Sequence, residues 1–285
     1  MSALPYRHQR VQRLRRLVGR RSARQEEGRV VIEGPNLLEE ALNSPIAIEA
    51  VYLDANWARS GSNSEARLSE LLERCYQSGA RVFELEPGVL ERVAGTVTPQ
   101  PVMAVVEVPS SRLSDVREAI PQLVVVCVDV RDPGNAGTVA RSAWAAGANA
   151  VICCEGTVDL WNPKAVRASA GAVLHVPIVM AGPPGETLGQ IGSWGLRRWG
   201  AVAAGGEDYA TIDLAAPCAF AVGNEAAGLP VEELRAYLDG LVSIPMAGGA
   251  ESLNVGMATA VLCFEAVRQR RCLAGAARSP ATGGL

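Results

Sequence analysis

Short apolar runs alternate with helical patterns along the second half of the chain. The runs are rich in Val, Ile, Leu and Ala and end in glycine or polar residues, as buried strands do. We expect strands at about 123–130, 150–154, 174–180, 200–204, 219–223 and 241–245. Because strands that alternate with helices form parallel sheets covered on both faces, the pattern predicts an α/β domain built on a parallel sheet.

The first part of the chain forms a separate α/β unit in the same analysis. After a basic helix, the pattern predicts strands at 29–34, 46–53, 80–85 and 102–108, with helices at 35–42, 65–78 and 87–94 and a surface loop at 61–64. A polar stretch at 109–114 marks the boundary. We therefore expect domains at 1–108 and 115–273, followed by a disordered Ala, Gly, Ser and Pro-rich tail at 274–285.

Composition indicates a soluble globular protein. Of the 285 residues, 48% are hydrophobic, enough for a substantial core. No window approaches the roughly 18 to 20 apolar residues of a membrane span, and no signal peptide is evident, so we expect a cytoplasmic protein with no membrane partner. Seven cysteines without a C-x-x-C pair argue against zinc, any other metal or a disulfide framework. His175 lies in an apolar run and is expected to be a satisfied core residue.

Charge is distributed unevenly along the chain. The formal net charge is −3, yet residues 1–30 contain nine arginines against two glutamates. Such clustering is the electrostatic footprint of a phosphate-binding protein. A solvated helix face or a flexible basic tail would explain the same charges, and charge alone leaves these alternatives open. The candidate RNA contacts are Arg7, Arg10, Arg13, Arg16, Arg20, Arg21, Lys164 and Arg167.

Three expected strands end in glycines beside polar residues. The first is followed by the stretch 132–141, interpreted as a glycine loop at 132–137 that leads into a helix. The others are followed by 223–230 and 246–255, the latter before a long apolar helix. Loops at the carboxyl ends of strands in open α/β sheets bind ligands, so we expect the chemistry at this edge.

These loops resemble the motifs of a known family. They match N-x-G-x-x-x-R at 135–141, G-x-E-x-x-G-L at 223–229 and I-P-M-x-G-x-x-x-S-L-N-V at 244–255, and the stretch 162–171 matches N-P-K-x-x-R-x-S-x-G. In this order they resemble the SpoU (TrmH-like) RNA ribose 2′-O-methyltransferases of the SPOUT superfamily. The resemblance implies a parallel-sheet SPOUT domain with a C-terminal trefoil knot, and a smaller N-terminal α/β ribosomal-protein-like RNA-binding domain.

The resemblance also implies the roles of individual residues. Arg141 matches the family's proton acceptor beside the acceptor ribose. Because a guanidinium has a pKa above about 12, orienting a phosphate and stabilising the developing alkoxide is physically easier than acting as a base. The other catalytic candidates are Asn135, Glu225, Ser252 and Asn254. The cofactor, S-adenosyl-L-methionine, would be held at Gly223, Asn224, Ile244, Met246 and Leu253.

Each polar candidate also has a structural alternative. Asn135 would orient Arg141 or the ribose, or would only favour a turn. Glu225 would hold loop N–H groups or pair with Arg141, or would cap the helix expected at 230–238. Ser252 and Asn254 lie where a helix N-cap would be. Gly256 departs from the family pattern, in which many members have serine, and this puts a local helix contact in doubt.

The function implied is 2′-O-methylation of a ribose in structured RNA, with 23S ribosomal RNA favoured over transfer RNA. A non-catalytic RNA-binding or ribosome-assembly factor is the alternative, and a dehydrogenase is disfavoured because the G-x-G-x-x-G fingerprint is missing. Family members are homodimers. The helix expected at 253–267 has an apolar surface wider than the roughly 100° stripe that one domain face requires. It would form the dimer interface, or else be an internal helix of a monomer.

Overall fold

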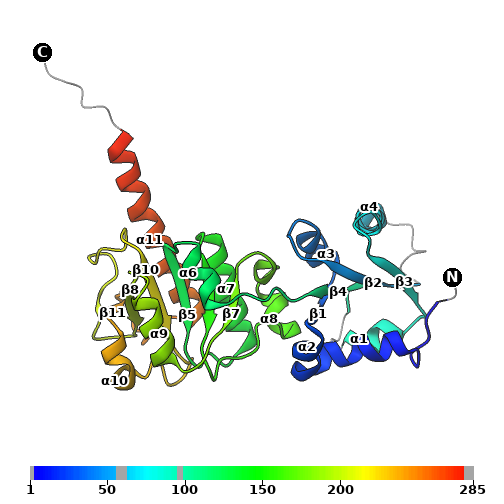
Figure 1. The fold of residues 1–285 in the computed structure, drawn as a ribbon, viewed down its shortest axis with the longest axis horizontal. Helices are drawn as coiled ribbons and strands as arrows, with labels where there is room; N and C mark the ends of the chain where they lie inside the picture. Colours follow the sequence, from blue (N-terminus) through cyan, green and yellow to red (C-terminus); the bar gives the residue numbers. More distant parts are fainter. Residues whose placement is uncertain (1–2, 56–62, 95–98, 279–285) are drawn as a thin grey trace, which may run out of the picture. The chain divides into compact units, whose positions relative to one another are not determined.

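The computed structural model describes residues 3–55, 63–94 and 99–278, and the chain divides into two compact units (Figure 1). The first unit is Met1–Pro109 with Asp159–His175, and the second is Ser110–Val158 with Val176–Leu285. Of the loop expected at 61–64, residues 61 and 62 lie outside the described part, and a helix begins at Asn63.

The first unit is built on a four-stranded mixed sheet in the order β1-β4-β2-β3. β4 pairs antiparallel with β1 and β2, whereas β2 and β3 are parallel. The strands are β1 (Arg29–Glu33), β2 (Ile48–Asp54), β3 (Arg81–Leu85) and β4 (Val102–Glu107). All four were expected from the apolar pattern, and β3 forms one edge of the sheet.

Helices complete this unit, and the arginine-rich segment is part of its core. The helices are α1 (Gln9–Gly19), α2 (Arg21–Glu27), α3 (Pro35–Leu42), α4 (Asn63–Gln77) and α5 (Val89–Ala94). α1 has its apolar residues at helical spacing, and Val11, Leu14 and Leu17 are completely buried. The basic segment is therefore a folded helix pair and not a flexible tail.

The segment Asp159–His175 belongs to the first unit, although we expected it within the domain 115–273. It contains the helix α8 (Pro163–Ala168) and a 3₁₀ turn, η2 (Ala172–Leu174). The buried guanidinium of Arg24 lies 2.6 Å from the Asp159 carboxylate, and His175 Nε2 lies 2.7 Å from Glu40 Oε2. His175 is thus satisfied by a carboxylate, which agrees with its expected structural role.

The second unit contains a seven-stranded sheet in the order β7-β6-β5-β10-β8-β11-β9, and all its neighbouring strands are parallel. The strands are β5 (Leu123–Cys127), β6 (Ala150–Cys153), β7 (Ile178–Met180), β8 (Arg197–Ala201), β9 (Glu207–Asp208), β10 (Cys218–Val222) and β11 (Gly240–Ser243). β5 and β10 are buried at every residue, which explains their continuous apolar sequences.

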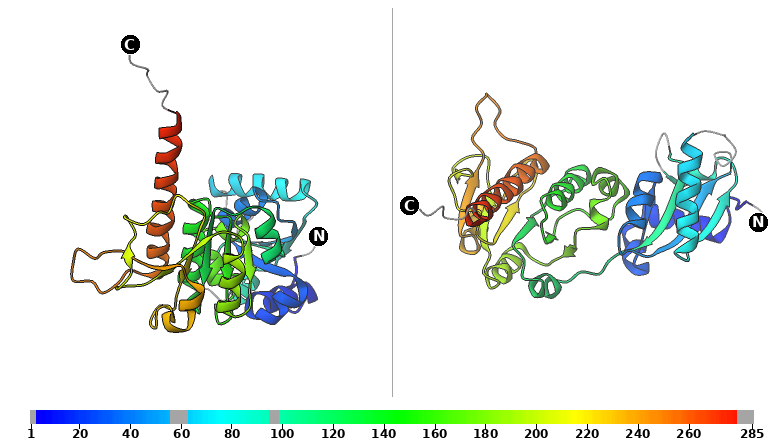
Figure 2. Two further views of the ribbon diagram at one scale, coloured as in Figure 1. Left: turned by 60° about the vertical axis from the view of Figure 1, so that its left-hand side comes forward. Right: turned by 90° about the horizontal axis from the view of Figure 1, so that it is seen from above.

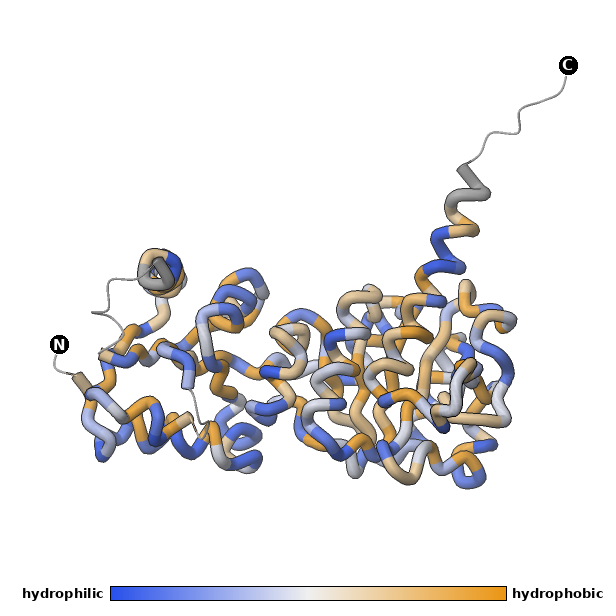
Figure 3. The backbone as a smooth tube through the Cα atoms, turned by 180° about the vertical axis from the view of Figure 1, so that it is seen from behind, coloured by the Kyte–Doolittle hydropathy of each residue, from blue (hydrophilic) through white to orange (hydrophobic). Residues whose placement is uncertain are grey.

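Helices cover both faces of this sheet, as predicted. The helices α6 (Leu113–Glu118) and α9 (Pro184–Gly192) share a core with alternate residues of β5 and β10. On the opposite face, α7 (Pro133–Ala145) and α11 (Val255–Arg278) pack against each other (Figure 2). Figure 3 shows apolar residues following the central strands and polar residues at the outer turns.

Several elements differ from the expectation. β7 starts at Ile178, because the preceding apolar residues form η2, and the short β9 was not expected. The helix expected at 230–238 is a short α10 (Val231–Leu234) followed by a 3₁₀ turn, η3 (Arg235–Tyr237). α11 continues to Arg278 through the first residues of the expected tail, and 279–285 lie outside the described residues. Within the described residues, no helix is long and apolar enough to cross a membrane.

Candidate active site at the carboxyl edge of the parallel sheet

The first motif lies at the start of α7, directly after β5. We expected a glycine loop at 132–137, but the helix already begins at Pro133. Pro133 suits the first helical position, and the Asp132 carboxylate caps the helix by accepting a hydrogen bond from the Asn135 N–H at 2.9 Å. Asn135 is therefore held rigidly in the first turn of a helix, with its side chain toward the sheet edge.

A chain of side-chain hydrogen bonds joins all three motifs. The Asn135 amide group donates to Glu225 Oε1 at 3.0 Å, and the Asn254 amide group donates to Asn135 Oδ1 at 2.8 Å. Glu225 also accepts the backbone N–H groups of Asp132 at 3.0 Å and Arg131 at 3.2 Å. Glu225 was expected to hold loop N–H groups or to pair with Arg141, and the structure shows the contact with the loop N–H groups.

These hydrogen bonds stabilise the charged form of Glu225. Burial would raise the pKa of this carboxyl, but the bonds from Asn135 and from backbone N–H groups offset that effect and lower its pKa. Because the pKa is lower in the folded state, the contribution to stability is fully present above the ordinary carboxyl pKa. It is lost as pH falls through the lowered pKa.

Replacing Glu225 by glutamine should therefore have a pH-dependent effect. At neutral pH, Glu225→Gln should lower the free energy of unfolding by about 1 kcal/mol, since the carboxylate is exposed and its interactions are screened. In acid the wild type is itself protonated, and the difference should vanish. Urea unfolding at both pH values measures this, with the exposed Glu232→Gln as control. A difference between wild type and Glu225→Gln that does not change with pH would contradict this account.

The second motif forms a tight loop after β10. A Cβ atom on Gly223 would lie 2.4 Å from the backbone of Gly228, so this position has room only for glycine. The Asn224 amide group donates to the Asp129 carbonyl at 2.9 Å, while its Oδ1 accepts the N–H groups of Ala226 and Ala227. Asp129 itself has a left-handed φ of 56°. Asn224 therefore shapes this loop and ties it to the loop after β5.

The third motif ends at the start of α11. Asn254 Oδ1 accepts the N–H of Gly256 at 2.9 Å, so Asn254 also caps the helix, as its structural alternative required. A Cβ atom on Gly256 would lie 2.6 Å from Thr138 Cγ2. Glycine here lets α11 approach α7 closely, and Ser142 Oγ lies 3.3 Å from the Gly256 carbonyl oxygen. The departure from the family pattern is thus accommodated by the packing of these two helices.

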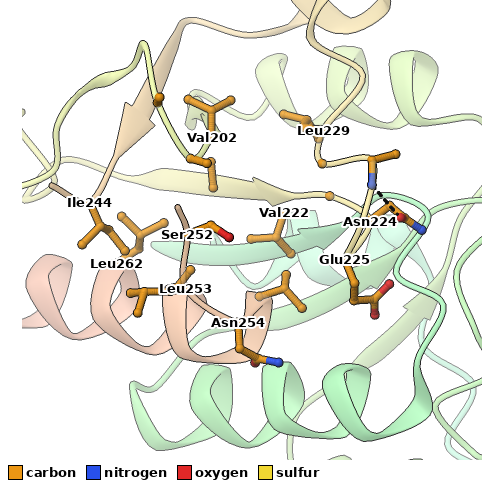
Figure 4. Close-up of a pocket in the computed structure, with 18 of the residues that line it drawn as sticks. Val202, Val222, Asn224, Glu225, Leu229, Ile244, Ser252, Leu253, Asn254 and Leu262 are labelled. Carbon is orange, nitrogen blue, oxygen red and sulfur yellow. Dashed lines mark hydrogen bonds between the residues drawn. The ribbon is translucent and has the colours of Figure 1, made fainter. Parts of the chain in front are cut away.

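The three motifs surround a cavity of about 590 Å³ at the carboxyl ends of β8, β10 and β11 (Figure 4). Its walls include candidates from all three motifs: Asn135, Gly223, Asn224, Glu225, Ile244, Met246, Ser252, Leu253 and Asn254. Sequence reasoning missed the segment 201–204 at the carboxyl end of β8, which also lines the cavity and which was expected to be part of a strand. The small residues that follow that strand were the available signal.

Arg141 does not line the cavity of its own chain. It lies two turns into α7, is exposed, and forms no ion pair with any described residue. Arg141 is six positions after Asn135, which places the two about 120° apart around the helix axis. The structure therefore does not bring Arg141 into contact with Asn135 or Glu225, and its charge remains available.

Seven of the eight candidate RNA contacts fall into two groups, and the eighth, Arg10, lies over the ring of Phe83. Arg13 lies 2.5 Å from both Glu27 and Glu49, Arg16 lies 3.4 Å from Glu27, and Arg167 lies 3.4 Å from Glu33. The hydrogen bond from Arg13 lowers the pKa of Glu49, so this pair stays ionised. Three arginines are exposed without an ion pair to the described residues, and Lys164 is also exposed. These three are Arg7, Arg20 and Arg21.

The cysteines take no part in this site. All seven are free, and all except Cys272 are buried. Burial raises the pKa of Cys154 to about 12 and that of Cys75 to about 11, so neither is a thiolate at neutral pH. Buried thiols of this kind act as small apolar residues, as expected from the sequence.

The fold and cavity define the class of protein, an α/β protein with a ligand site at the carboxyl edge of a parallel sheet. A model of the SpoU rRNA Methylase family matches residues 122–264, and one of the MRM3-like substrate binding domain matches residues 8–104. The chain therefore belongs to the SpoU rRNA methylase family, which confirms the resemblance seen in its motifs.

Individual relatives support the same assignment. The chain is 33% identical over 235 residues to the 23S rRNA (guanosine(2553)-2′-O)-methyltransferase RlmP of Bacillus subtilis, covering 82% of this chain and 86% of that protein. It is 30% identical over 275 residues to the 23S rRNA (uridine(2479)-2′-O)-methyltransferase of Streptomyces viridochromogenes, covering 93% and 91%. The structure of AdoMet-bound rRNA methyltransferase from Sinorhizobium meliloti superposes with a TM-score of 0.77 at 31% identity, covering 92% and 95%.

Proposed function

We propose that this chain is an S-adenosyl-L-methionine-dependent methyltransferase that modifies a ribose 2′-hydroxyl in 23S ribosomal RNA. The observation that carries the proposal is the Glu225–Asn135–Asn254 hydrogen-bond chain, which assembles the three family motifs beside one cavity. A factor that only binds RNA has no need of this arrangement. Membership of the SpoU rRNA methylase family and the two relatives that act on 23S rRNA support the substrate.

The cavity suits the proposed cofactor. Its volume of about 590 Å³ falls in the usual range for a pocket that encloses one small molecule. Gly223 brings backbone close to the cavity, and Ile244, Met246 and Leu253 offer apolar surface for an adenine ring. The bound cofactor would supply an activated methyl group, and the Sinorhizobium meliloti relative was solved with AdoMet.

The polar residues would position the acceptor. Asn135 and Glu225 hold each other at the cavity edge, where an incoming ribose could be oriented by hydrogen bonds. Asn254 donates to Asn135 at the same edge, and Ser252, on the segment that leads into α11, also lines the cavity. Arg141 is exposed and has no ion pair to the described residues, so it would be available to hold the substrate phosphate and stabilise the developing alkoxide. Because it does not line the cavity of its own chain, it would take this role from the second copy of the homodimer proposed below.

Methylation mapping tests the substrate and separates the proposed enzyme from a non-catalytic ribosome-assembly factor. Ribose 2′-O-methyl positions in ribosomal RNA should be mapped in cells with and without the gene, and in cells expressing Asn135→Ala. We expect one 23S position to lose its methyl group in both deficient strains. An unchanged map would contradict the proposal, and a change confined to transfer RNA would assign the enzyme to tRNA. Action on ribosomal RNA would place the enzyme in the cytoplasm.

We also propose that the active form is a homodimer whose interface includes α11. This helix exposes Met257, Phe264 and Leu273 at 61%, 47% and 62% of their surface. Water-exposed apolar side chains at such density on one helix fit an interface between copies. Under the same proposal the segment 244–254 completes the family's trefoil knot, which stays a prediction.

Placing a charge on this helix should dissociate the dimer. Phe264→Glu should shift the sedimentation coefficient from that of a dimer to that of a monomer at micromolar concentration, because a buried carboxylate at an interface is costly. The control is Tyr76→Glu, which places the same charge on an exposed aromatic position of α4 in the first unit. A wild type that sediments as a monomer while transferring methyl groups would contradict the dimer.

A further inference from the structure

Three arginines of the first unit lie over aromatic rings. The guanidinium carbon of Arg10 is 4.6 Å from the ring centre of Phe83, and that of Arg92 is 3.6 Å from the ring centre of Tyr6. Arg15 lies 6.0 Å above the same tyrosine ring. We name these five residues the arginine–aromatic cluster. Only Arg10 of the five is among the RNA contacts expected from the sequence.

The fold holds both rings in place. Leu4 pairs with the edge strand β3, with its N–H 2.8 Å from the Glu84 carbonyl oxygen, and this pairing places Tyr6 just before α1. Gln12 Nε2 donates to the Tyr6 carbonyl at 2.6 Å. Tyr6 and Phe83 are partly buried and pack against the core of the unit. The rings are thus fixed supports on which the guanidinium groups rest.

The arginines of the cluster keep their positive charge, and Arg15 and Arg92 are exposed whereas Arg10 is half-buried. Arg10, Arg15 and Arg92 form no ion pair with the described residues, in contrast to Arg13 on the same helix α1. A guanidinium held against an aromatic ring retains its charge, and its planar outer face can stack on another planar group. Each guanidinium group of the cluster therefore offers both a positive charge and a planar surface for stacking.

We propose that the arginine–aromatic cluster binds an unpaired, single-stranded segment of the RNA substrate, with phosphates near the arginines and bases stacked on the guanidinium planes. Unpaired bases stack on aromatic rings and arginine planes, whereas bases inside a duplex are already stacked and inaccessible. The match to an MRM3-like substrate binding domain covers these residues from position 8 onward. The inference rests on the proposed function, because it concerns the RNA of that reaction.

Two double variants separate charge from stacking. Arg10→Gln with Arg92→Gln removes both, whereas Arg10→Lys with Arg92→Lys keeps the charge but has no planar group to stack. The control, Arg117→Gln with Arg235→Gln, removes two exposed charges from the second unit. Fluorescence anisotropy measures the binding of two labelled probes over a range of salt concentrations. One is a single-stranded oligoadenylate of about twelve nucleotides, and the other is an RNA duplex of about twelve base pairs.

For the single strand, the glutamine pair should weaken binding by about tenfold or more and reduce the log–log salt slope by about 1.4. The lysine pair should weaken binding by about fivefold with an unchanged slope. The control pair and binding to the duplex should change little. Normal binding by the lysine pair would overturn the stacking proposal, as would equal losses for duplex and single strand. If polyglutamate displaces the labelled single strand as well as unlabelled oligoadenylate does, the ligand of the cluster is an acidic protein instead.

Methyl transfer to 23S ribosomal RNA by the wild type is measured alongside. If the wild type transfers methyl groups but all variants bind the single strand normally, only the inference about the cluster fails. If the variants lose binding as expected but the wild type transfers no methyl group, only the proposed function fails. Thermal unfolding of each variant, followed by circular dichroism, verifies that the first unit is folded.

Discussion

Arg141→Ala should lower the turnover number for methyl transfer by about 10²-fold or more, the scale of a positioned group that assists proton loss. Arg141 is exposed and forms no ion pair with the described residues, so its removal breaks no ion pair there. Because it does not line the cavity, cofactor affinity should stay within about twofold of the wild type. Single-turnover kinetics and calorimetric titration with the cofactor measure the two quantities separately.

Arg141→Lys is the matched variant for this prediction. Lysine keeps a positive charge but lacks the planar fork that binds a phosphate with two parallel hydrogen bonds. We expect it to restore only part of the lost turnover. Near-normal methylation by Arg141→Ala would remove this residue from the mechanism. A parallel loss of cofactor binding would show instead that Arg141 supports the structure of the site.

Gly223→Ala should weaken cofactor binding by about tenfold or more. The added Cβ atom would lie 2.4 Å from the carbonyl group of Gly228 and from the backbone nitrogen of Leu229. Backbone atoms cannot move aside like a flexible side chain, so the loop 223–229 must open. Overpacking of this kind costs about 1–3 kcal/mol, and the loop carries Glu225 as well as a wall of the cavity. Calorimetric titration of the cofactor measures the effect.

Gly182→Ala, in the second unit and outside the cavity, provides the control for this substitution. A Cβ atom there would meet nothing within 4 Å, so the same chemical change should leave cofactor binding within about twofold of the wild type. Thermal unfolding would show whether Gly223→Ala leaves the second unit folded. Unchanged cofactor affinity in a folded Gly223→Ala variant would disprove the assignment of this cavity to the cofactor.

The hydrophobic pattern predicted the strands well where they are buried on both faces. β5 and β10 have continuous apolar sequences because both faces of the sheet are covered. These runs contain no polar residue that would favour a turn. The same pattern placed β7 too early, because Val173 and Leu174 are buried in a 3₁₀ turn. In the sequence, a short apolar run that forms a buried strand cannot be distinguished from one that forms a buried turn.

The start of α7 was misjudged for a different physical reason. Pro-Gly-Asn-x-Gly has the composition of a turn, and each of these residues disfavours a helix interior. At a helix N-terminus the same residues are acceptable, because Pro133 needs no hydrogen-bond donor there and Asp132 caps the free N–H groups. The choice between a turn and a helix N-terminus was decided by the position of the sheet edge and by the capping contact.

The sequence by itself determined the class of fold, the family and the three segments that form the site, because buried strands and motif spacings are local features. Tertiary structure alone decided which side chains act together. Asn135 bonds to residues 90 and 119 positions away, and Arg13 is neutralised by Glu49 while Arg10 lies over Phe83. Contacts between distant positions depend on how strands order and helices pack, and a list of residue types along one dimension does not contain that geometry.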